Sequence, residues 1–315
     1  MIEQADKPYA IEGKDGYFFL AGDSNDSVGQ FTKPTCLSDE TAQGWEKTLQ
    51  SLEALTAERD ITGCFLVAPA KEEIFPDKYP LNQAKGRLFD DFKARFGGRI
   101  FVPYWALRNT RNFSYCTGDT HWTDLGASMA AVAVLDQWGY DRDEAKKARP
   151  QDFRLVQRFG DLGIKAKPHF AHYEMMFSDD MAGRIIFNNG VRNQGNIAIY
   201  RNPDAAYAGR LLIFGDSFGT NMAAAFSSFF PEVVYTYRPA ALDIGLVDLV
   251  QPTHLILEVT QRFLQGQPDL RSSIFDMARS KLNDLAPEER DKAIAAIAAQ
   301  PEYRGIRAAS LAAFE

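Results

Sequence analysis

Two short segments of the chain carry the residue types that nucleophilic catalysis through serine requires. Gly118–Thr123 contains Asp119 and His121, and Gly215–Phe218 contains Ser217. A serine hydroxyl becomes an effective nucleophile when a histidine within hydrogen-bonding reach takes its proton. A carboxylate on the other ring nitrogen then orients that histidine. The two segments together predict a Ser217–His121–Asp119 triad for acyl transfer.

The spacing around the histidine supports this interpretation. Asp119 and His121 are two residues apart, which places both side chains on the same side of an extended segment. The residues that follow predict a helix over Ala127–Trp138, with Thr123 or Asp124 as its N-cap. Taken alone, His121 could equally be a core histidine, with Asp119 as its helix-cap partner.

The serine segment predicts a strand-to-helix turn. The apolar run Leu211–Phe214 ends at Gly215 and is typical of a buried strand, and Gly219–Phe229 predicts the next helix. Free backbone N–H groups at such a turn, including that of Phe218, can bind a developing oxyanion. The alternative for Ser217 is an ordinary helix N-cap.

Two other patterns in the sequence are given no chemical role. Gly22–Ser24 is another Gly-Asp-Ser triplet, but a polar run follows it, which favours a plain turn. His169 and His172 are three residues apart without a cysteine nearby in sequence, so no metal site is predicted. No cofactor is predicted either.

Composition limits the class of protein. A chain of 315 residues forms one large α/β domain or two smaller ones. It is 45% hydrophobic and 24% charged, as soluble globular proteins are, and its net charge of −7 argues against a general nucleic-acid binder. We find no apolar run of about 18 residues, so no transmembrane segment is predicted. Residues 1–10 lack a signal-peptide core. Either the protein stays in the cytoplasm, or an export segment is absent from this chain.

Three cysteines give an odd count without a CxxC motif. Cys64 begins an apolar run, which predicts a buried free thiol. Cys36 and Cys116 could pair in an oxidising compartment, but free thiols are favoured for these two as well.

Strand and helix patterns alternate along the chain, which predicts a mainly parallel sheet with helices on both faces. The predicted strands are Ile61–Ala68, Arg99–Tyr104, Leu211–Phe214, Val233–Tyr237 and His254–Val259. The predicted helices, besides Ala127–Trp138 and Gly219–Phe229, are Asp39–Asp60, Leu81–Phe96, Ala241–Val250, Phe275–Leu285 and Pro287–Gln300.

Domain boundaries follow from the same patterns. Residues 1–10 are expected to form a loose tail, 11–315 a single domain, and 270–315 its C-terminal helices. Residues 153–210 form an irregular insert on or beside the sheet, with a hairpin around Asn188–Gly190. Pro69–Pro76 is expected as a loop at the carboxyl end of a strand, where open α/β sheets build their sites.

The two catalytic segments resemble the alginate O-acetyltransferase proteins, which are SGNH-hydrolase-like proteins of bacterial exopolysaccharide O-acetylation. The resemblance rests on Asp119-Thr120-His121-Trp122-Thr123 with Gly126-Ala127, and on Gly215-Asp216-Ser217-Phe218. The histidine segment precedes the serine segment, as in the circularly permuted alginate group. Further similar segments are Gly13–Leu20, Val67–Pro76, Gly160–Gly163 and Glu258–Leu264.

The resemblance implies a three-layer α/β/α fold of the SGNH-hydrolase type, with an insert before the serine segment. It implies Asp119, His121 and Ser217 as the triad, and transfer of an acetyl group to a hydroxyl of a polysaccharide. In such systems a membrane-bound O-acyltransferase usually passes the acetyl group across the membrane. The implied compartment is the periplasm.

Four further residues are candidates for binding the oxyanion or the substrate. The glycine and asparagine of the SGNH pattern are expected near Thr236–Arg238 and Val259–Arg262, which lack them, so Arg238 and Arg262 are candidate substitutes. Lys71 and Trp122 are candidate substrate contacts. The alternatives are surface salt bridges for Lys71, Arg238 and Arg262, and, favoured slightly, a core position for Trp122.

Three functions remain open from the sequence. The chain is an O-acetyltransferase with an acetyl-serine intermediate, an esterase that uses the same triad, or a non-catalytic polysaccharide-binding scaffold. Access of water to the acyl-enzyme is all that separates the first two. An intact triad argues against the third.

Overall fold

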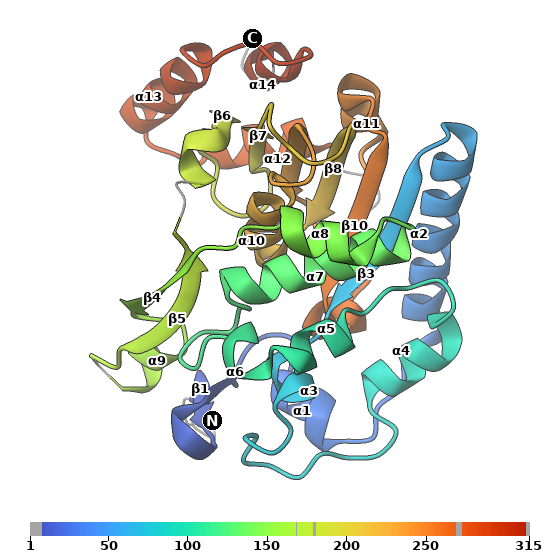
Figure 1. Ribbon diagram of the computed structural model, residues 1–315, viewed down its shortest axis with the longest axis vertical. Coiled ribbons are helices and arrows are strands. Elements are labelled where there is room, and N and C mark those ends of the chain that lie inside the picture. Colours follow the sequence, from blue (N-terminus) through green and yellow to red (C-terminus); the bar gives the residue numbers. More distant parts are fainter. Residues whose placement is uncertain (1–7, 168, 179–180, 269–272, 313–315) are drawn as a thin grey trace, which may run out of the picture.

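A six-stranded sheet forms the centre of the protein (Figure 1). The computed structural model describes residues 8–167, 169–178, 181–268 and 273–312. Along the sheet the strands are β3 (Thr62–Ala68), β10 (His254–Thr260), β8 (Arg210–Gly215), β9 (Glu232–Tyr237), β7 (Ile197–Arg201) and β6 (Ile185–Asn188). The first four strands are parallel to one another, and β7 and β6 are antiparallel to their neighbours.

Helices cover both faces of this sheet. Alternate residues of β8 show the two layers, because Leu211 and Ile213 enter one hydrophobic core while Leu212 and Phe214 enter the other. The first core contains α7 (Asp124–Gln137) and α10 (Ser217–Phe226). The second contains α2 (Asp39–Glu58), α4 (Leu88–Phe96), α11 (Ile244–Val250) and α12 (Ile274–Asn283). The predicted three-layer α/β/α fold with a mainly parallel sheet is confirmed.

The insert has two parts. Its first part is an antiparallel pair of strands, β4 (Phe153–Arg158) and β5 (His172–Phe177), with the short helix α9 (Gly163–Ala166) between them. Figure 1 shows this arm to one side of the central sheet. Its second part follows η2 (Met181–Arg184) and is the expected hairpin, whose strands β6 and β7 extend the central sheet.

The N-terminal segment is more ordered than predicted where it is described. Ala10, which was expected in the tail, begins β1 (Ala10–Glu12), and this strand pairs with β2 (Phe18–Leu20) across η1 (Lys14–Gly16). Residues 1–7 of the predicted tail lie outside the described residues.

One predicted strand was wrong, and two other predicted segments differ from the structure. Arg99–Tyr104 is not a strand: Phe101 forms a single bridge with Leu66, and Pro103 lacks the N–H that would continue the ladder. The helix expected from Leu81 begins only at Leu88, after Gly86 with its positive φ of 68°. The expected loop Pro69–Pro76 contains the one-turn helix α3 (Lys71–Ile74).

The remaining elements are α1 (Ser27–Thr32), α5 (Tyr104–Asn109), α6 (Arg111–Ser114), α8 (Arg142–Ala148), η3 (Gln261–Gln265), α13 (Pro287–Ala298) and α14 (Ile306–Ala312). All three cysteines are free. Cys64 is buried, as predicted, whereas Cys36 is exposed and Cys116 is buried. The possible Cys36–Cys116 pair is therefore not formed.

Candidate active site

Ser217 lies at the strand-to-helix turn that the sequence predicts. Strand β8 ends at Gly215, and the buried Asp216 caps α10, of which Ser217 is the first residue. The Asp216 carboxylate accepts the N–H of Phe218 at 2.9 Å through Oδ1 and the N–H of Thr260 at 2.8 Å through Oδ2. The residue before the nucleophile thus fixes the turn to both α10 and the end of β10.

A second buried acid supports this turn. Glu258 accepts the N–H of Asp216 at 2.8 Å, and a Cβ at position 215 would lie against the same carboxyl oxygen, which explains the glycine there. Burial, reinforced by the charge of Asp216, raises the pKa of Glu258 well above its usual range. This shift favours the protonated carboxyl of Glu258 beside the charge of Asp216.

Asp119, His121 and Ser217 form one continuous chain of hydrogen bonds. The Asp119 Oδ1 atom lies 2.6 Å from Nδ1 of His121 and also accepts the backbone N–H of His121 at 2.9 Å. The Nε2 atom of His121 lies 2.7 Å from Oγ of Ser217. Residues 96 positions apart in the sequence thus meet at one point. The arrangement has the geometry in which a histidine removes the proton of a serine hydroxyl.

The charge state of Asp119 suits that role. Burial alone would raise the pKa of Asp119, but the hydrogen bond and the charge of His121 outweigh burial and lower this pKa well below its usual range. The carboxylate therefore stays ionised at neutral pH. It can orient the imidazole and stabilise the imidazolium that forms when Ser217 loses its proton.

The insert contributes a residue to which the sequence analysis gave no role. Asp161 donates its N–H to Oδ2 of Asp119 at 3.0 Å, and its carboxylate accepts the N–H and the hydroxyl of Thr120 at 2.8 and 2.9 Å. Burial, together with the neighbouring charge of Asp119, raises the pKa of Asp161. The motif Gly160–Gly163 was noted in the sequence, but its contact with a segment about 40 residues earlier is visible only in the fold.

Trp122 and Phe218 join the two catalytic segments. The indole N–H of Trp122 donates to the carbonyl oxygen of Phe218 at 3.1 Å, and the Phe218 ring lies 5.0 Å from the ring of His121. Trp122 is only 1% exposed, so it occupies the core position and is not a platform for a sugar ring. The Phe218 amide donates to Asp216, which removes it as a free oxyanion donor.

Lys71 is a buried cation and not a surface residue. Its Nζ atom donates to the carbonyl oxygens of Phe18 and Cys116, each at 2.7 Å, and to that of Thr117 at 3.3 Å. Burial lowers the pKa of Lys71 to about 8. The alternative of a surface salt bridge is therefore wrong. Lys71 fixes the segment that leads directly into Asp119.

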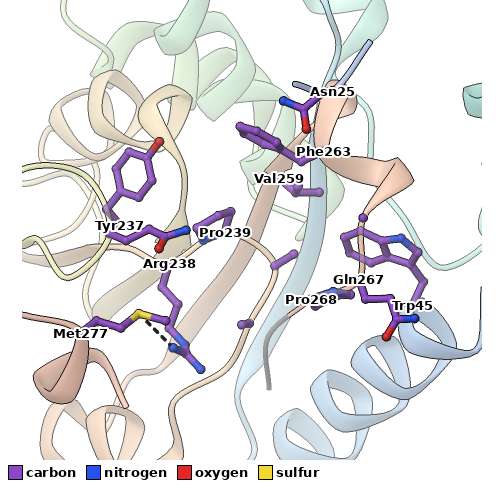
Figure 2. Close-up of a pocket in the computed structure, with 14 residues that line it drawn as sticks. Asn25, Trp45, Tyr237, Arg238, Pro239, Val259, Phe263, Gln267, Pro268 and Met277 are labelled. Atoms are coloured by element: carbon purple, nitrogen blue, oxygen red, sulfur yellow. Dashed lines mark hydrogen bonds between the residues drawn. The ribbon is translucent and has the colours of Figure 1, made fainter. Parts of the chain in front are cut away.

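The two candidate arginines have different neighbours. Arg238 is buried; its backbone N–H donates to the Gly215 carbonyl at 2.8 Å and its guanidinium reaches Sδ of Met277 at 3.4 Å (Figure 2). The Arg262 guanidinium lies over the rings of Phe218 and Phe263, 5.7 and 4.7 Å from their centroids. Arg262 thus packs on a neighbour of Ser217, whereas Arg238 extends toward α12.

Tyr237 is a site residue that the sequence analysis missed. It ends β9 directly opposite Gly215 in the parallel register, and its side chain packs against the core layer that contains α10, the helix that Ser217 begins. Burial raises the pKa of Tyr237 to about 12. A single tyrosine carries no signal of its own. The clue available in the sequence was that its strand ends beside the strand that carries the serine.

A cavity of about 270 Å³ adjoins Tyr237 (Figure 2). Its lining includes Arg238 and Phe263 and the amide side chains of Asn25, Gln194 and Gln267. The cavity therefore offers both an aromatic surface and hydrogen-bonding groups beside Tyr237 and Arg238. A lining of this kind suits a small polar ligand.

Potential metal ligands gather at two places among the described residues. One group is Asp119, His121 and Asp161 at the site itself, and the other is Cys116, His172 and Glu174. In the second group Glu174 accepts from Cys116 at 2.6 Å, lies 3.4 Å from Nε2 of His172, and pairs with Arg158 at 3.1 Å. These bonds link the three side chains directly, while Nδ1 of His172 is buried without a hydrogen-bond partner in the described structure. The cysteine beside His172 was not expected from the sequence.

Comparison with known proteins extends the structural result. No known protein-family model matches the chain, and no match was found among curated proteins. Among solved structures, the O-acetyltransferase domain of Pseudomonas putida AlgJ superposes with a TM-score of 0.50 at 15% identity, over 91% of this chain and 98% of that one. Bacillus cereus PatB1 gives 0.59 at 11% identity, over 82% of this chain and 98% of that chain.

A third solved structure, a DHHW family protein from Eubacterium siraeum, gives a TM-score of 0.50 at 15% identity, over 82% of this chain and 96% of that one. At these identities the comparison establishes a common fold. The predicted resemblance is confirmed at that level, since the AlgJ domain is among the structural neighbours. Among the described helices, none combines the length and hydrophobicity needed to cross a membrane.

Proposed function

We propose that this protein is an O-acetyltransferase that carries an acetyl group on Ser217 and passes it to a hydroxyl of a bacterial polysaccharide. The observation that supports this most directly is the unbroken chain of hydrogen bonds from Asp119 through His121 to Ser217, at 2.6 and 2.7 Å. The fold shared with the AlgJ O-acetyltransferase domain supports the acetyl group as cargo. The resemblance to the alginate O-acetyltransferase proteins supports a polysaccharide as acceptor.

The proposed reaction has two steps. In the first, His121 takes the Ser217 proton while Oγ bonds to the acetyl carbon. The resulting oxyanion collapses, and the donor's leaving group departs with the proton from His121. In the second, His121 takes the proton of an acceptor hydroxyl, which attacks the acetyl-serine and releases Ser217. The backbone N–H of Ser217, in the first turn of α10, is a suitable oxyanion donor because first-turn amides lack intrahelical partners.

The partners and compartment in this proposal follow from the resemblance. A polysaccharide is the acceptor, and the acetyl donor reaches Ser217 through a membrane-bound O-acyltransferase, which places the reaction in the periplasm. The two half-reactions need no metal or organic cofactor, because proton transfer by His121 and covalent attachment to Ser217 supply the chemistry.

Hydrolysis is the second candidate function, and one observation favours it. The side chains of His121 and Asp119 are 27% and 21% exposed, so water can reach the base. Incubation with p-nitrophenyl acetate, with and without an oligosaccharide, separates the two functions. Acetate bound to sugar supports transfer, whereas free acetate alone in both reactions supports an esterase. A scaffold role predicts neither product.

Replacing Ser217 by alanine should abolish release of p-nitrophenol and eliminate the acetylated Ser217 peptide in mass spectrometry, since no other hydroxyl contacts His121 Nε2 in the described structure. Ser24→Ala is the matched control, because Ser24 lies in the other Gly-Asp-Ser triplet, where Asp23 bonds to Ser27 in a turn. Ser24→Ala should keep the parent rate. A Ser217→Ala variant as fast as the parent would remove Ser217 from the mechanism.

A further inference from the structure

An oxyanion formed at Ser217 needs more donors than the serine amide, and several backbone groups nearby are already engaged. The N–H of Phe218 donates to Asp216, as does that of Thr260, and the N–H of Arg238 donates to Gly215. At the positions where the SGNH pattern expects glycine and asparagine, the N–H groups of Arg238 and Thr260 are thus used to build the turn. A side chain is then a suitable source of a further oxyanion donor.

Tyr237 is placed to supply that donor. Its backbone is fixed on both sides, because its N–H donates to Asn196 at 2.9 Å and its carbonyl accepts from Gly195 at 3.2 Å. Its partner across the strand pair is Gly215, two residues before the nucleophile. Figure 2 shows the Tyr237 ring and the Arg238 side chain extending in opposite directions from the end of β9.

The position of Tyr237 relative to Ser217 is the one that an oxyanion donor needs. The Tyr237 side chain packs on the same face of the sheet as α10, the helix that Ser217 begins, while Ser217 Oγ keeps its 2.7 Å bond to His121. In the tetrahedral intermediate the negative charge is on the former carbonyl oxygen, which is bonded to the same carbon as Ser217 Oγ. Hydrogen-bond donors to this oxygen should therefore lie near Oγ without displacing His121 from it. Burial raises the pKa of Tyr237 to about 12, so the phenol remains protonated at neutral pH.

We propose that the Tyr237 hydroxyl is a catalytic oxyanion donor, which binds the acyl oxygen as Ser217 attacks. When Oγ bonds to the acyl carbon, the carbonyl electron pair moves to the oxygen, and the phenol donates a hydrogen bond to it without transferring its proton. Tyr237 also lines the 270 Å³ cavity, so the acyl oxygen would be bound at the side of the site that faces this cavity. This inference rests on the proposed attack by Ser217.

The test is Tyr237→Phe, which keeps the ring and removes only the donor. Loss of one oxyanion donor lowers kcat by about 10²–10³ fold, so we expect a loss of that size on p-nitrophenyl acetate with KM little changed. The affinity of a boronic acid, which forms a tetrahedral adduct with serine, should fall in parallel. Tyr303→Phe is the control, since Tyr303 is a buried phenol that donates to Glu232 at 3.0 Å.

A second measurement separates this inference from the proposed function. Labelling of Ser217 by phenylmethylsulfonyl fluoride, followed by mass spectrometry, requires no acetyl turnover. If the parent does not turn over acetyl esters but its labelling falls about 100-fold in Tyr237→Phe, the inference stands and the proposed function fails. Labelling and kcat within threefold of the parent would overturn the inference while the proposed function stands. A parent that is never labelled at Ser217 would overturn both.

Discussion

Each oxygen of the Asp119 carboxylate has its own partner. Oδ1 bonds to the ring and backbone of His121, and Oδ2 accepts the N–H of Asp161. The carboxylate therefore cannot rotate without losing bonds on both sides. Such a fixed acid keeps the proton of the imidazole on Nδ1 and leaves Nε2 free to act as the base.

Replacing Asp119 by asparagine should lower kcat by up to about 10⁴ fold, because the amide keeps the shape but no longer selects the reactive histidine tautomer. The rate of p-nitrophenyl acetate hydrolysis measures the effect. Asp143→Asn is the control, since Asp143 is an exposed acid that pairs only with Lys146 in the described structure. A full-rate Asp119→Asn enzyme would show that the carboxylate takes no part in the reaction.

At the scale of elements, the arm formed by β4, α9 and β5 is packed closely against the loop that carries Asp119. A Cβ at Gly160 would overlap the carbonyl oxygen of Gly118, and one at Gly163 would meet the ring of Phe170. The N–H groups of Leu162 and Gly163 both donate to the Gly118 carbonyl, at 3.1 and 2.7 Å. The insert therefore serves as the support on which the Asp119 turn is built.

Gly160→Ala should push the arm away from the loop that carries Asp119. The added Cβ would overlap the Gly118 carbonyl oxygen, and a backbone atom cannot move aside as a flexible side chain would. We expect a loss of about 1–3 kcal/mol in the free energy of unfolding, the usual cost of overpacking, together with a lower kcat. Urea unfolding and ester hydrolysis measure the two effects. Gly98→Ala is the control, because a Cβ there meets nothing within 4 Å. Equal behaviour of the two variants would argue against this role of the arm.

At the scale of the whole molecule, β10 connects the site with the opposite end of the sheet. Its last residue, Thr260, bonds to Asp216 at the site, while its first, His254, is buried beside Tyr140 and Thr253. Burial lowers the pKa of His254 to about 4. The end of the sheet away from the site thus depends on a histidine that remains neutral.

This histidine should make stability fall with acidity. Between pH 6.5 and about 4 the unfolded chain protonates His254 while the folded chain does not, so stability is lost over that window by up to about 3 kcal/mol. His254→Gln should lose less stability than the parent between pH 7 and 4.5 in urea unfolding. His169→Gln, at an exposed position, should follow the parent. Identical pH profiles for His254→Gln and the parent would contradict this assignment.

Local signals account for what the sequence could predict. The apolar run before Gly215 predicted the turn at Ser217. Thr123 and Asp124 were the two predicted N-caps of α7, and Thr123 is the cap, since its hydroxyl accepts the Gly126 N–H at 3.0 Å. Tyr237 and Asp161 were missed because their roles depend on contacts between distant segments. The predicted strand at Arg99–Tyr104 failed because apolar residues mark burial and say nothing of whether a partner strand continues alongside.

The indole bond between Trp122 and Phe218 has a consequence for turnover. Once Ser217 is acetylated, its oxygen can no longer donate to His121, and the direct link between nucleophile and base is lost. The Trp122–Phe218 bond involves no reacting atom and persists through both half-reactions. The imidazole should therefore remain beside the ester after acetylation, ready to activate an incoming alcohol without any reassembly of the loops.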